Sequence, residues 1–263
     1  MSKRLISFSL YGDKLIYLEG ALANVHCVQQ YLPSFIARFY YDDTVPENYI
    51  EDLRKQSNTE LINMSASQLP KMIWRFLAAD DKEVALFFSF DTDSRIGEME
   101  AVIIEQWLQS DKQFLVVKDH PVYHVQPLMM GGMWGMKNIS PFSMEDLAEA
   151  WFRKRRESNL EKYNEDQIFL REVIYPKAKE SLLYIDEFNT NGIPDAKPLP
   201  VKRQNYHFVG EAFNEDNSRR NEYKALRTYY LSRKGLFWKW WIRVYDFLDI
   251  KVFNRSKHQY IER

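Results

Sequence analysis

The stretch Val84-Ala85-Leu86-Phe87-Phe88-Ser89-Phe90-Asp91-Thr92-Asp93-Ser94-Arg95 is an apolar run that ends abruptly in two carboxylates. A short apolar run bounded by polar residues is typical of a buried strand. Asp91 and Asp93 lie two positions apart, so in an extended chain their side chains point to the same face. Carboxylate oxygens suit magnesium or manganese, which complete their shells with water and substrate phosphate. The stretch therefore predicts a strand that carries a metal-binding pair at its end and indicates nucleotide-diphosphate chemistry.

The sequence around this stretch alternates between strand-like and helix-like segments. Strands are expected at Leu5–Leu10, Phe35–Tyr41, Glu60–Met64, Val84–Phe90 and Phe114–Val117, and helices at Asn48–Gln56, Gln68–Ala79 and Glu98–Gln109. Two later helices are expected, around the basic cluster Arg153–Arg156 and around Asp166–Val173. The alternation predicts an α/β sheet with largely parallel strands. Ligands of such sheets bind beyond the carboxyl ends of the strands, where Asp91 and Asp93 are expected.

The composition fits a chain that folds without disulfides and does not bind nucleic acid. Its 263 residues, 45% of them hydrophobic, are enough for one large domain. The 36 basic and 37 acidic residues nearly cancel, so no overall field favours a nucleic acid as the partner. The single cysteine, Cys27, excludes an intrachain disulfide. No signal peptide and no run of ~20 apolar residues is found, so we expect a cytoplasmic protein.

A glycine-rich segment, Pro127-Leu128-Met129-Met130-Gly131-Gly132-Met133-Trp134-Gly135, follows the fifth expected strand. Its composition is typical of a loop. The glycines let the main chain approach a ligand closely, and Trp134 offers an apolar platform for a flat substrate. The alternative is a tight turn packed under a tryptophan, and the glycines alone favour neither interpretation.

Two further side chains can complete a site around the carboxylates. His207, in Tyr206-His207-Phe208-Val209-Gly210, offers an imidazole that can join two carboxylates on a metal. Arg95 can pair with a diphosphate or hold a carboxylate in place. For any single histidine, a structural hydrogen-bonded role is the more common one.

Four motifs, taken in chain order, resemble those of one family. They are Asp91-Thr92-Asp93, Gly131-Gly132-Met133-Trp134-Gly135, Asp166-Gln167-Ile168-Phe169-Leu170 and His207-Phe208-Val209-Gly210. They are similar to motifs of nucleotide-sugar glycosyltransferases of the GT-A fold, in the glycogenin and bacterial galactosyltransferase group. The resemblance implies a GT-A-like, Rossmann-like mixed sheet flanked by helices. It also implies transfer of a hexose or related sugar from a nucleotide diphosphate donor, such as a UDP-sugar, to a glycan or lipid-linked acceptor.

The resemblance also implies roles for individual residues. Asp91, Asp93 and His207 are expected to hold Mn2+ or Mg2+, and Asp166 and Gln167 to lie beside the donor sugar as catalytic residues. The expected donor-binding residues are Tyr11, Arg75, Arg95, Gly131, Gly132 and Trp134.

One departure from the family pattern concerns the diphosphate. The lysine-proline-tryptophan that normally follows the H-F-x-G motif is absent, since Gly210 leads into Glu211-Ala212-Phe213-Asn214. Arg95 or a later basic residue is therefore expected to contact the diphosphate. Retention or inversion at the sugar stays open.

A proton acceptor is expected in the segment Lys118-Asp119-His120-Pro121-Val122-Tyr123-His124. A carboxylate near an acceptor hydroxyl can take its proton, and Asp119 is the first candidate, followed by His120 and His124. An aspartate before a loop also commonly caps backbone amides, so a simple turn is the alternative.

Two other classes of protein compete with the transferase. Phe90-Asp91-Thr92-Asp93 after an apolar strand resembles haloacid-dehalogenase-type phosphatases, in which the first aspartate is a nucleophile and the second a general acid. That motif expects threonine or valine where this chain has Arg95, and it opens its domain, whereas several expected strands precede Asp91. A non-catalytic module that binds a nucleotide sugar is the third class.

The segment Gly235–Phe253 carries an aromatic face interleaved with basic residues. If it is helical, its apolar residues share one face: Phe237, Trp240, Trp241, Val244, Phe247 and Leu248. Such a helix packs on the catalytic domain, as large aromatic stripes usually do, or lies peripherally in a membrane interface. We expect a catalytic domain over 1–215 and a helical extension over 216–263.

Overall fold

The computed structural model describes residues 2–125, 128–137, 142–157 and 164–232. In these residues a seven-stranded sheet has the order β3-β2-β1-β4-β6-β5-β7. The strands are β1 (Lys3–Leu10), β2 (Ile36–Tyr41), β3 (Thr59–Asn63), β4 (Val84–Phe90), β5 (Phe114–Lys118), β6 (Met133–Lys137) and β7 (Leu182–Asp186). Strand β6 pairs antiparallel with β4 and β5, and the other neighbouring pairs are parallel. The expected α/β class with a mixed sheet is confirmed.

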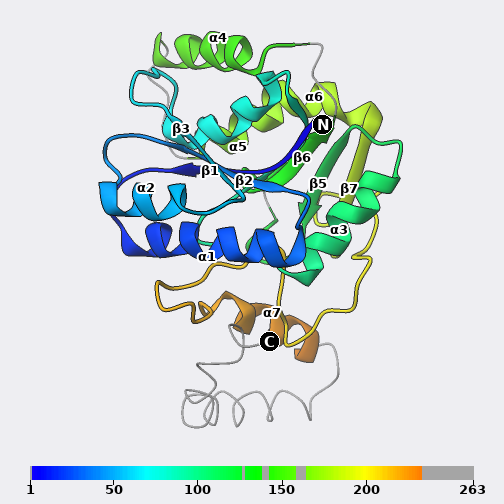
Figure 1. Cartoon of the computed structure of the whole chain (residues 1–263). Coiled ribbons are helices and arrows are strands. Elements are labelled where there is room, and N and C mark those ends of the chain that lie inside the picture. Colours follow the sequence, from blue (N-terminus) through cyan, green and yellow to red (C-terminus); the bar gives the residue numbers. More distant parts are fainter. Residues whose placement is uncertain (1, 126–127, 138–141, 158–163, 233–263) are drawn as a thin grey trace.

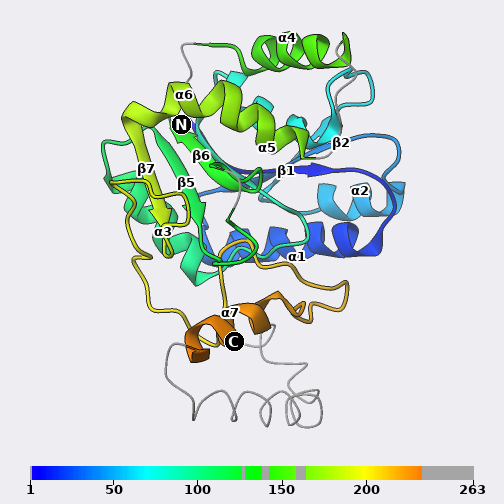
Figure 2. The same cartoon turned by 180° about the vertical axis from the view of Figure 1, so that it is seen from behind.

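Helices cover both faces of this sheet (Figure 1). One face carries α1 (Leu15–Tyr31), α2 (Glu47–Arg54) and α3 (Glu98–Gln109). The other carries the 3-10 helix η1 (Lys71–Asp80), α4 (Met144–Glu157), α5 (Glu165–Phe169), a π-helical turn η2 (Leu170–Ile174), α6 (Tyr175–Ala178) and a 3-10 turn η3 (Lys179–Ser181). Helix α7 (Glu222–Ser232) lies beyond α1, outside these two layers (Figures 1 and 2).

Alternate residues of the strands divide the core into two clusters. Phe8, Phe88 and Phe90 pack with buried residues of α1, α2 and α3. Phe87 and Trp134 pack with buried residues of η1, α4, α5 and η2 on the opposite face. Because both faces of β4 are covered, its sequence is apolar except for Ser89 and does not alternate with polar residues.

The glycine-rich segment contains a central strand, which corrects the expectation of a loop. Strand β6 runs between β4 and β5, with Met133 opposite Phe90 at the carboxyl end of β4. Gly135 is needed in this strand, since a Cβ there would lie 2.7 Å from the carbonyl oxygen of Phe87 and 2.9 Å from the Trp107 ring. The reversed direction of β6 brings the residues just before it to the same edge of the sheet as the end of β4.

Helix α1 holds the loop that follows β4. A Cβ at Gly20 would overlap the carbonyl oxygen of Thr92. One turn later, the side-chain amide of Asn24 donates to the carbonyl oxygens of Thr92 and Ser94, at 3.2 and 2.7 Å. These contacts fix the backbone of the loop that carries the carboxylate pair.

Replacing Gly20 with alanine is expected to destabilise the fold by about 2 kcal/mol. Glycine to alanine in a helix interior normally stabilises by up to about 1 kcal/mol. Here the new methyl group meets a backbone carbonyl that cannot move without displacing the loop. Urea unfolding of the variant measures the effect, and a midpoint equal to or above that of the parent would contradict this packing.

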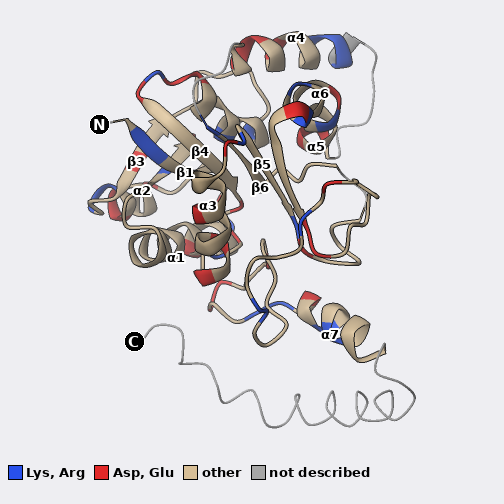
Figure 3. Cartoon of the chain, turned by 90° about the vertical axis from the view of Figure 1, so that its right-hand side faces the viewer, with Lys and Arg blue, Asp and Glu red and all other residues tan. Residues whose placement is uncertain are grey.

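The basic cluster lies at the C-terminal end of α4, and acidic residues occupy the first turn (Figure 3). This arrangement complements the helix dipole. Arg153 and Lys154 are exposed, and the Arg155 guanidinium stacks 4.6 Å from the Trp151 ring. The side chains of Arg153 and Lys154 thus belong to a solvated helix face.

The expected helix at Gly235–Phe253 lies outside the described residues. Whether this segment packs on the domain or contacts a membrane therefore stays open. The expected domain boundary at residue 215 stays a prediction. None of the helices in the described ranges is both long enough and apolar enough to cross a bilayer.

Candidate functional site

Expected site residues from three segments meet at the carboxyl end of β4. Arg75 of η1 forms an ion pair with Asp91, and its Nη2 lies 3.2 Å from Oδ2 of Asp166 at the start of α5. The Arg75 side chain is only 8% exposed and that of Asp166 11%, so their ion pair lies in surroundings of low polarity, whereas the side chain of Asp91 is 47% exposed. Gln167 is half-buried next to Asp166. The structure thus joins Asp91 to Asp166 through one buried arginine.

Gly131 and Gly132 close this cluster from the side of β6. A Cβ at Gly131 would overlap the Asp166 carboxylate and lie 2.6 Å from Arg75 Nη2. A Cβ at Gly132 would overlap the Asp91 carboxylate. Both glycines are therefore required by the neighbouring ion pairs, and their contact with a donor stays a prediction.

The surroundings of Asp93 disfavour the negative charge of its carboxylate. Burial raises the pKa of Asp93 to about 6, with a further increase from the charge of Asp91 and a decrease from Arg220. Arg220 Nη2 lies 3.5 Å from Asp93 Oδ2. A bound cation would relieve the repulsion between the two carboxylates.

The carboxylate pair fits a divalent ion that is shared with substrate phosphate. Magnesium in such sites takes one or two protein carboxylates and completes its shell from water and phosphate. The side chains of Asp91 and Asp93 are 47% and 18% exposed, so both remain accessible. In the described ranges, however, no group of three histidine, cysteine, aspartate or glutamate side chains could hold a metal. The structure therefore does not gather His207 with the pair.

His207 bonds to a different carboxylate. Its Nδ1 lies 2.5 Å from Oε2 of Glu211, and Arg219 donates to both oxygens of Glu211, at 2.7 and 3.0 Å. Burial favours the neutral ring, but the bond to Glu211 and the charge of Glu100 raise the pKa of His207 overall. Metal-ligating histidines commonly have one ring nitrogen fixed in this way, which leaves Nε2 for the ion. Metal binding by His207 stays a prediction.

Arg95 is committed to the protein backbone and to one asparagine. Its Nη1 donates to the carbonyl oxygens of Thr92 and Ser94, at 3.2 and 2.8 Å. Its Nε and Nη2 both donate to Oδ1 of Asn217, at 3.0 and 2.8 Å. Arg95 therefore holds the loop after β4, and these bonds argue against the expected contact with a diphosphate.

Trp134 lies in the core and not on a ligand-facing surface. It is fully buried in β6, with ring centroids 5.2 Å from Phe76 and 5.1 Å from Phe87. The expected platform for a flat substrate is thus not available at this position. The alternative, a tight turn packed under a tryptophan, is also wrong for Met133–Gly135, which belong to strand β6.

Asp119 is an internal ion-pair partner. Its side chain is 0% exposed, both of its oxygens pair with Arg203, and Oδ2 accepts the N–H of Val209 at 3.0 Å. Burial raises the pKa of Asp119 to about 6, against the opposing effect of Arg203. A general base must reach the hydroxyl that it deprotonates, so these surroundings argue against the expected role. Asp119 instead tethers the segment around His207 to the end of β5.

His120 and His124 stabilise the turn after β5. Nδ1 of His120 accepts two backbone N–H groups of this turn at 3.1 Å, and Nδ1 of His124 accepts the N–H of Asp119 at 3.0 Å. Burial lowers the pKa of His120 to about 4 and that of His124 to about 3. The expected alternative, a structural turn, accounts for both side chains.

We expect a loss of stability below neutral pH that depends on His124. Its folded pKa lies below the ordinary 6.5, so its stabilisation is complete above pH 6.5 and is lost as the pH falls toward 3. At about 1.4 kcal/mol per pKa unit, the loss reaches roughly 2 kcal/mol near pH 5. His124→Asn keeps a side-chain acceptor and cannot titrate, so its urea midpoint should change less with pH. Exposed His26 provides the control His26→Asn, and an unchanged pH dependence in His124→Asn would contradict the assignment.

Tyr11 and a lysine missed at the sequence level line the edge between β1 and β2. The Tyr11 ring lies 6.2 Å from that of Trp74, and Lys71 Nζ is 5.6 Å from the Tyr11 ring centroid. Lys71 also forms an ion pair with Asp42, which follows β2 as Asp91 follows β4. The sequence could have indicated this pair, because Asp42 directly follows a predicted strand, as Asp91 does.

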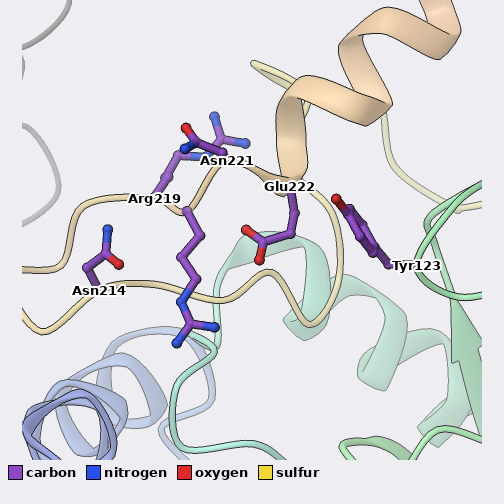
Figure 4. A pocket seen from close by; sticks show the side chains of 6 residues that line it. Tyr123, Asn214, Arg219, Asn221 and Glu222 are labelled. Carbon is purple, nitrogen blue, oxygen red and sulfur yellow. The ribbon is translucent and has the colours of Figure 1, made fainter.

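The segment after β7 returns to the carboxylate pair and brings a second missed residue. Phe213 N–H donates to the carbonyl oxygen of Asp93 at 2.8 Å, and Ser94 pairs with Ala212 in an antiparallel bridge. This pairing places Arg220 beside Asp93. A cavity of about 410 Å³ lies next to it, lined by Tyr123, Asn214, Arg219, Arg220, Asn221 and Glu222 (Figure 4).

The chain matches no protein-family model and no curated protein. Among solved structures, it is similar to the galactosyltransferase LgtC in complex with donor and acceptor sugar analogues, at 13% identity over 70% of this chain and 73% of that one, with a TM-score of 0.42. The glycosyltransferase GlyE of Streptococcus pneumoniae is 15% identical over 69% of this chain and 45% of that one, with a TM-score of 0.43. 4-Diphosphocytidyl-2C-methyl-D-erythritol synthase from Anaerococcus prevotii is 12% identical over 69% and 87%, also with 0.43. At these identities and scores, the likeness carries no information on what this chain binds.

Proposed function

We propose that the chain is a metal-dependent glycosyltransferase that uses a nucleotide diphosphate sugar, with a UDP-sugar as the first candidate. The observation that carries the proposal is the ion-pair chain Asp91–Arg75–Asp166 at the carboxyl end of β4. It joins a carboxylate suited to a metal to a second, buried carboxylate at the edge of the sheet where ligands of such folds bind. Asp91 would hold the metal that stabilises the anionic leaving group, and the negative charge of Asp166 suits the cationic sugar.

Asp91 and Asp93 are the residues that would hold Mn2+ or Mg2+, and His207 is a further candidate. When bound, the ion stabilises the negative charge that develops on the leaving diphosphate. Arg75 orients the Asp91 carboxylate through their ion pair, and Gly132 leaves room for it. The carboxylate is thereby held in one position before a donor arrives.

Asp166 and Gln167 are proposed to lie beside the transferred sugar. Burial raises the pKa of Asp166, and Arg75 opposes this effect. A carboxylate held near the anomeric carbon stabilises the positive charge that builds on the sugar ring as its bond to the diphosphate breaks. The amide of Gln167 can bind a sugar hydroxyl. We expect a glycan or lipid-linked acceptor and a cytoplasmic enzyme, with 235–253 as the segment for any peripheral membrane contact.

The proposal is tested by turnover of a panel of nucleotide sugars with manganese and a mixture of glycan acceptors. Release of nucleoside diphosphate from at least one donor is expected, and chelation of the metal should abolish it. Release of phosphate from simple phosphomonoesters, without turnover of any nucleotide sugar, would support the phosphatase instead.

A further inference from the structure

A diphosphate at this site must approach two carboxylates of its own sign. Most of the nearby arginines already use their donors within the protein. Arg75 is buried between Asp91 and Asp166, and Arg95 bonds to Asn217 and to backbone carbonyls. Arg219 donates to both oxygens of Glu211 and to the carbonyl oxygen of Asn205. These three arginines therefore have little to offer a ligand.

Arg220 differs from these arginines. Its side chain is 32% exposed, and its contact with Asp93, at 3.5 Å, is longer than a charge-assisted hydrogen bond of about 2.8 Å. In the ranges that the structure describes, this ion pair is the one polar contact of its guanidinium. A guanidinium has five N–H donors, so most of them are available to an anion.

The backbone fixes the position of Arg220. Its N–H donates to the carbonyl oxygen of Ala212 at 3.2 Å, and Phe213 pairs with Arg219 in an antiparallel bridge. The same Phe213 donates its N–H to the carbonyl oxygen of Asp93 at 2.8 Å. The strand pairing that carries Arg220 is therefore attached to the backbone of Asp93 itself, which orders the arginine before a ligand binds.

We infer that Arg220 is the residue that contacts the diphosphate of the donor. The inference rests on the proposed function and adds to it the positive side chain that binds the leaving diphosphate. Arg220 contacts Asp93 and also lines the cavity of about 410 Å³. Asn221 offers a further amide there, whereas the amide of Asn214 donates to Ser218 at 3.0 Å and Glu222 adds a carboxylate (Figure 4). A planar guanidinium binds two phosphate oxygens at once, so the arginine fixes the orientation of the group as well as its charge.

Binding of UDP and of uridine in the presence of manganese, measured by calorimetry, tests the inference. Arg220→Ala should weaken UDP binding by roughly 10- to 100-fold, since a charge-assisted bidentate contact is lost. Uridine, which lacks the diphosphate, should bind the variant and the parent equally. Arg220→Lys should retain part of the affinity, because it keeps the charge without the planar fork. Arg54→Ala removes an exposed arginine of α2 and is the control for a change in net charge.

Each outcome decides the assignment. Equal UDP affinity for Arg220→Ala and the parent would overturn the inference and leave the proposed function intact. Equal losses for UDP and uridine would also overturn it, because the residue would then act through the fold or the base. If the parent binds no nucleoside diphosphate, the proposed function fails and the inference fails with it. Arg220→Gln, of similar length and uncharged, gives the same comparison if Arg220→Ala does not fold.

Discussion

Asp93→Asn is expected to abolish manganese-dependent donor binding and to lower turnover by roughly 10³-fold, or about 4 kcal/mol in the barrier. The substitution keeps the shape of the side chain and removes an anionic ligand beside the diphosphate. Asp91→Asn should act in the same direction and also break the ion pair with Arg75. Calorimetric titration with UDP and manganese, together with turnover, measures both effects. Asp195→Asn, at an exposed position, is the matched control.

The carboxylate pair would lose its assigned role if Asp93→Asn and Asp91→Asn bound UDP and manganese like the parent. A loss of turnover with unchanged metal dependence would place both residues beside the substrate instead. A lower unfolding midpoint in Asp93→Asn would indicate that the effect comes from the fold. The thermal melting curves of all variants therefore accompany the titrations.

Arg75→Met is expected to cost about 3 kcal/mol of stability and nearly all turnover. The Arg75 side chain is 8% exposed and its guanidinium pairs with Asp91 and Asp166, so its removal leaves two carboxylates without their common partner. Arg75→Lys should have a smaller effect on stability because it keeps the positive charge, and some loss should remain because one ammonium cannot span both carboxylates equally well. Urea unfolding gives the free energies.

The double variant Arg75→Met/Asp166→Asn separates this account from a simple packing effect. Removing the charge of Asp166 relieves part of the uncompensated repulsion, so the double variant should be more stable than Arg75→Met alone. If the losses of stability in Arg75→Met and Asp166→Asn simply add in the double variant, Arg75 does not stabilise the fold by pairing with Asp166. In that case the ion-pair chain would not explain the stability.

The parts of the fold that were predicted are those with a strong local pattern. Strand β4 is an almost continuous apolar run, and α3 follows it with helical spacing. Strand β6 was missed because glycine is rare in strands. Gly135 is required by its close contact with Phe87 and Trp107, which are distant from it in sequence. Helix α1 was not expected either, although Leu18, Ala21, Val25 and Val28 have helical spacing, since other apolar residues, such as Ile16, Leu22 and Ala23, fall between them.

In the site, too, contacts between residues distant in sequence were not predicted. Asp91 and Asp93 were predicted because they directly follow a strand, and the edge of the sheet then brings Arg75 and Asp166 to them. Arg220 reaches Asp93 only through the pairing of two distant segments, which no local pattern reports.

Asp119 and Arg95 have other roles in the structure than the sequence predicts, because their partners could not be identified from the sequence. The carboxylate of Asp119 is paired with Arg203, and the guanidinium of Arg95 with Asn217. A residue type indicates what a side chain can do, whereas its partner decides whether the side chain is available to a ligand. These partners come from segments far along the chain.

Titration of the full chain with UDP, with and without manganese, tests the central claim most directly. The account predicts binding in the presence of manganese that chelation abolishes and that Asp93→Asn does not show. Binding of UDP with equal affinity with and without the metal would contradict the metal site at Asp91 and Asp93. Absence of binding to UDP and to GDP under both conditions would contradict the glycosyltransferase itself.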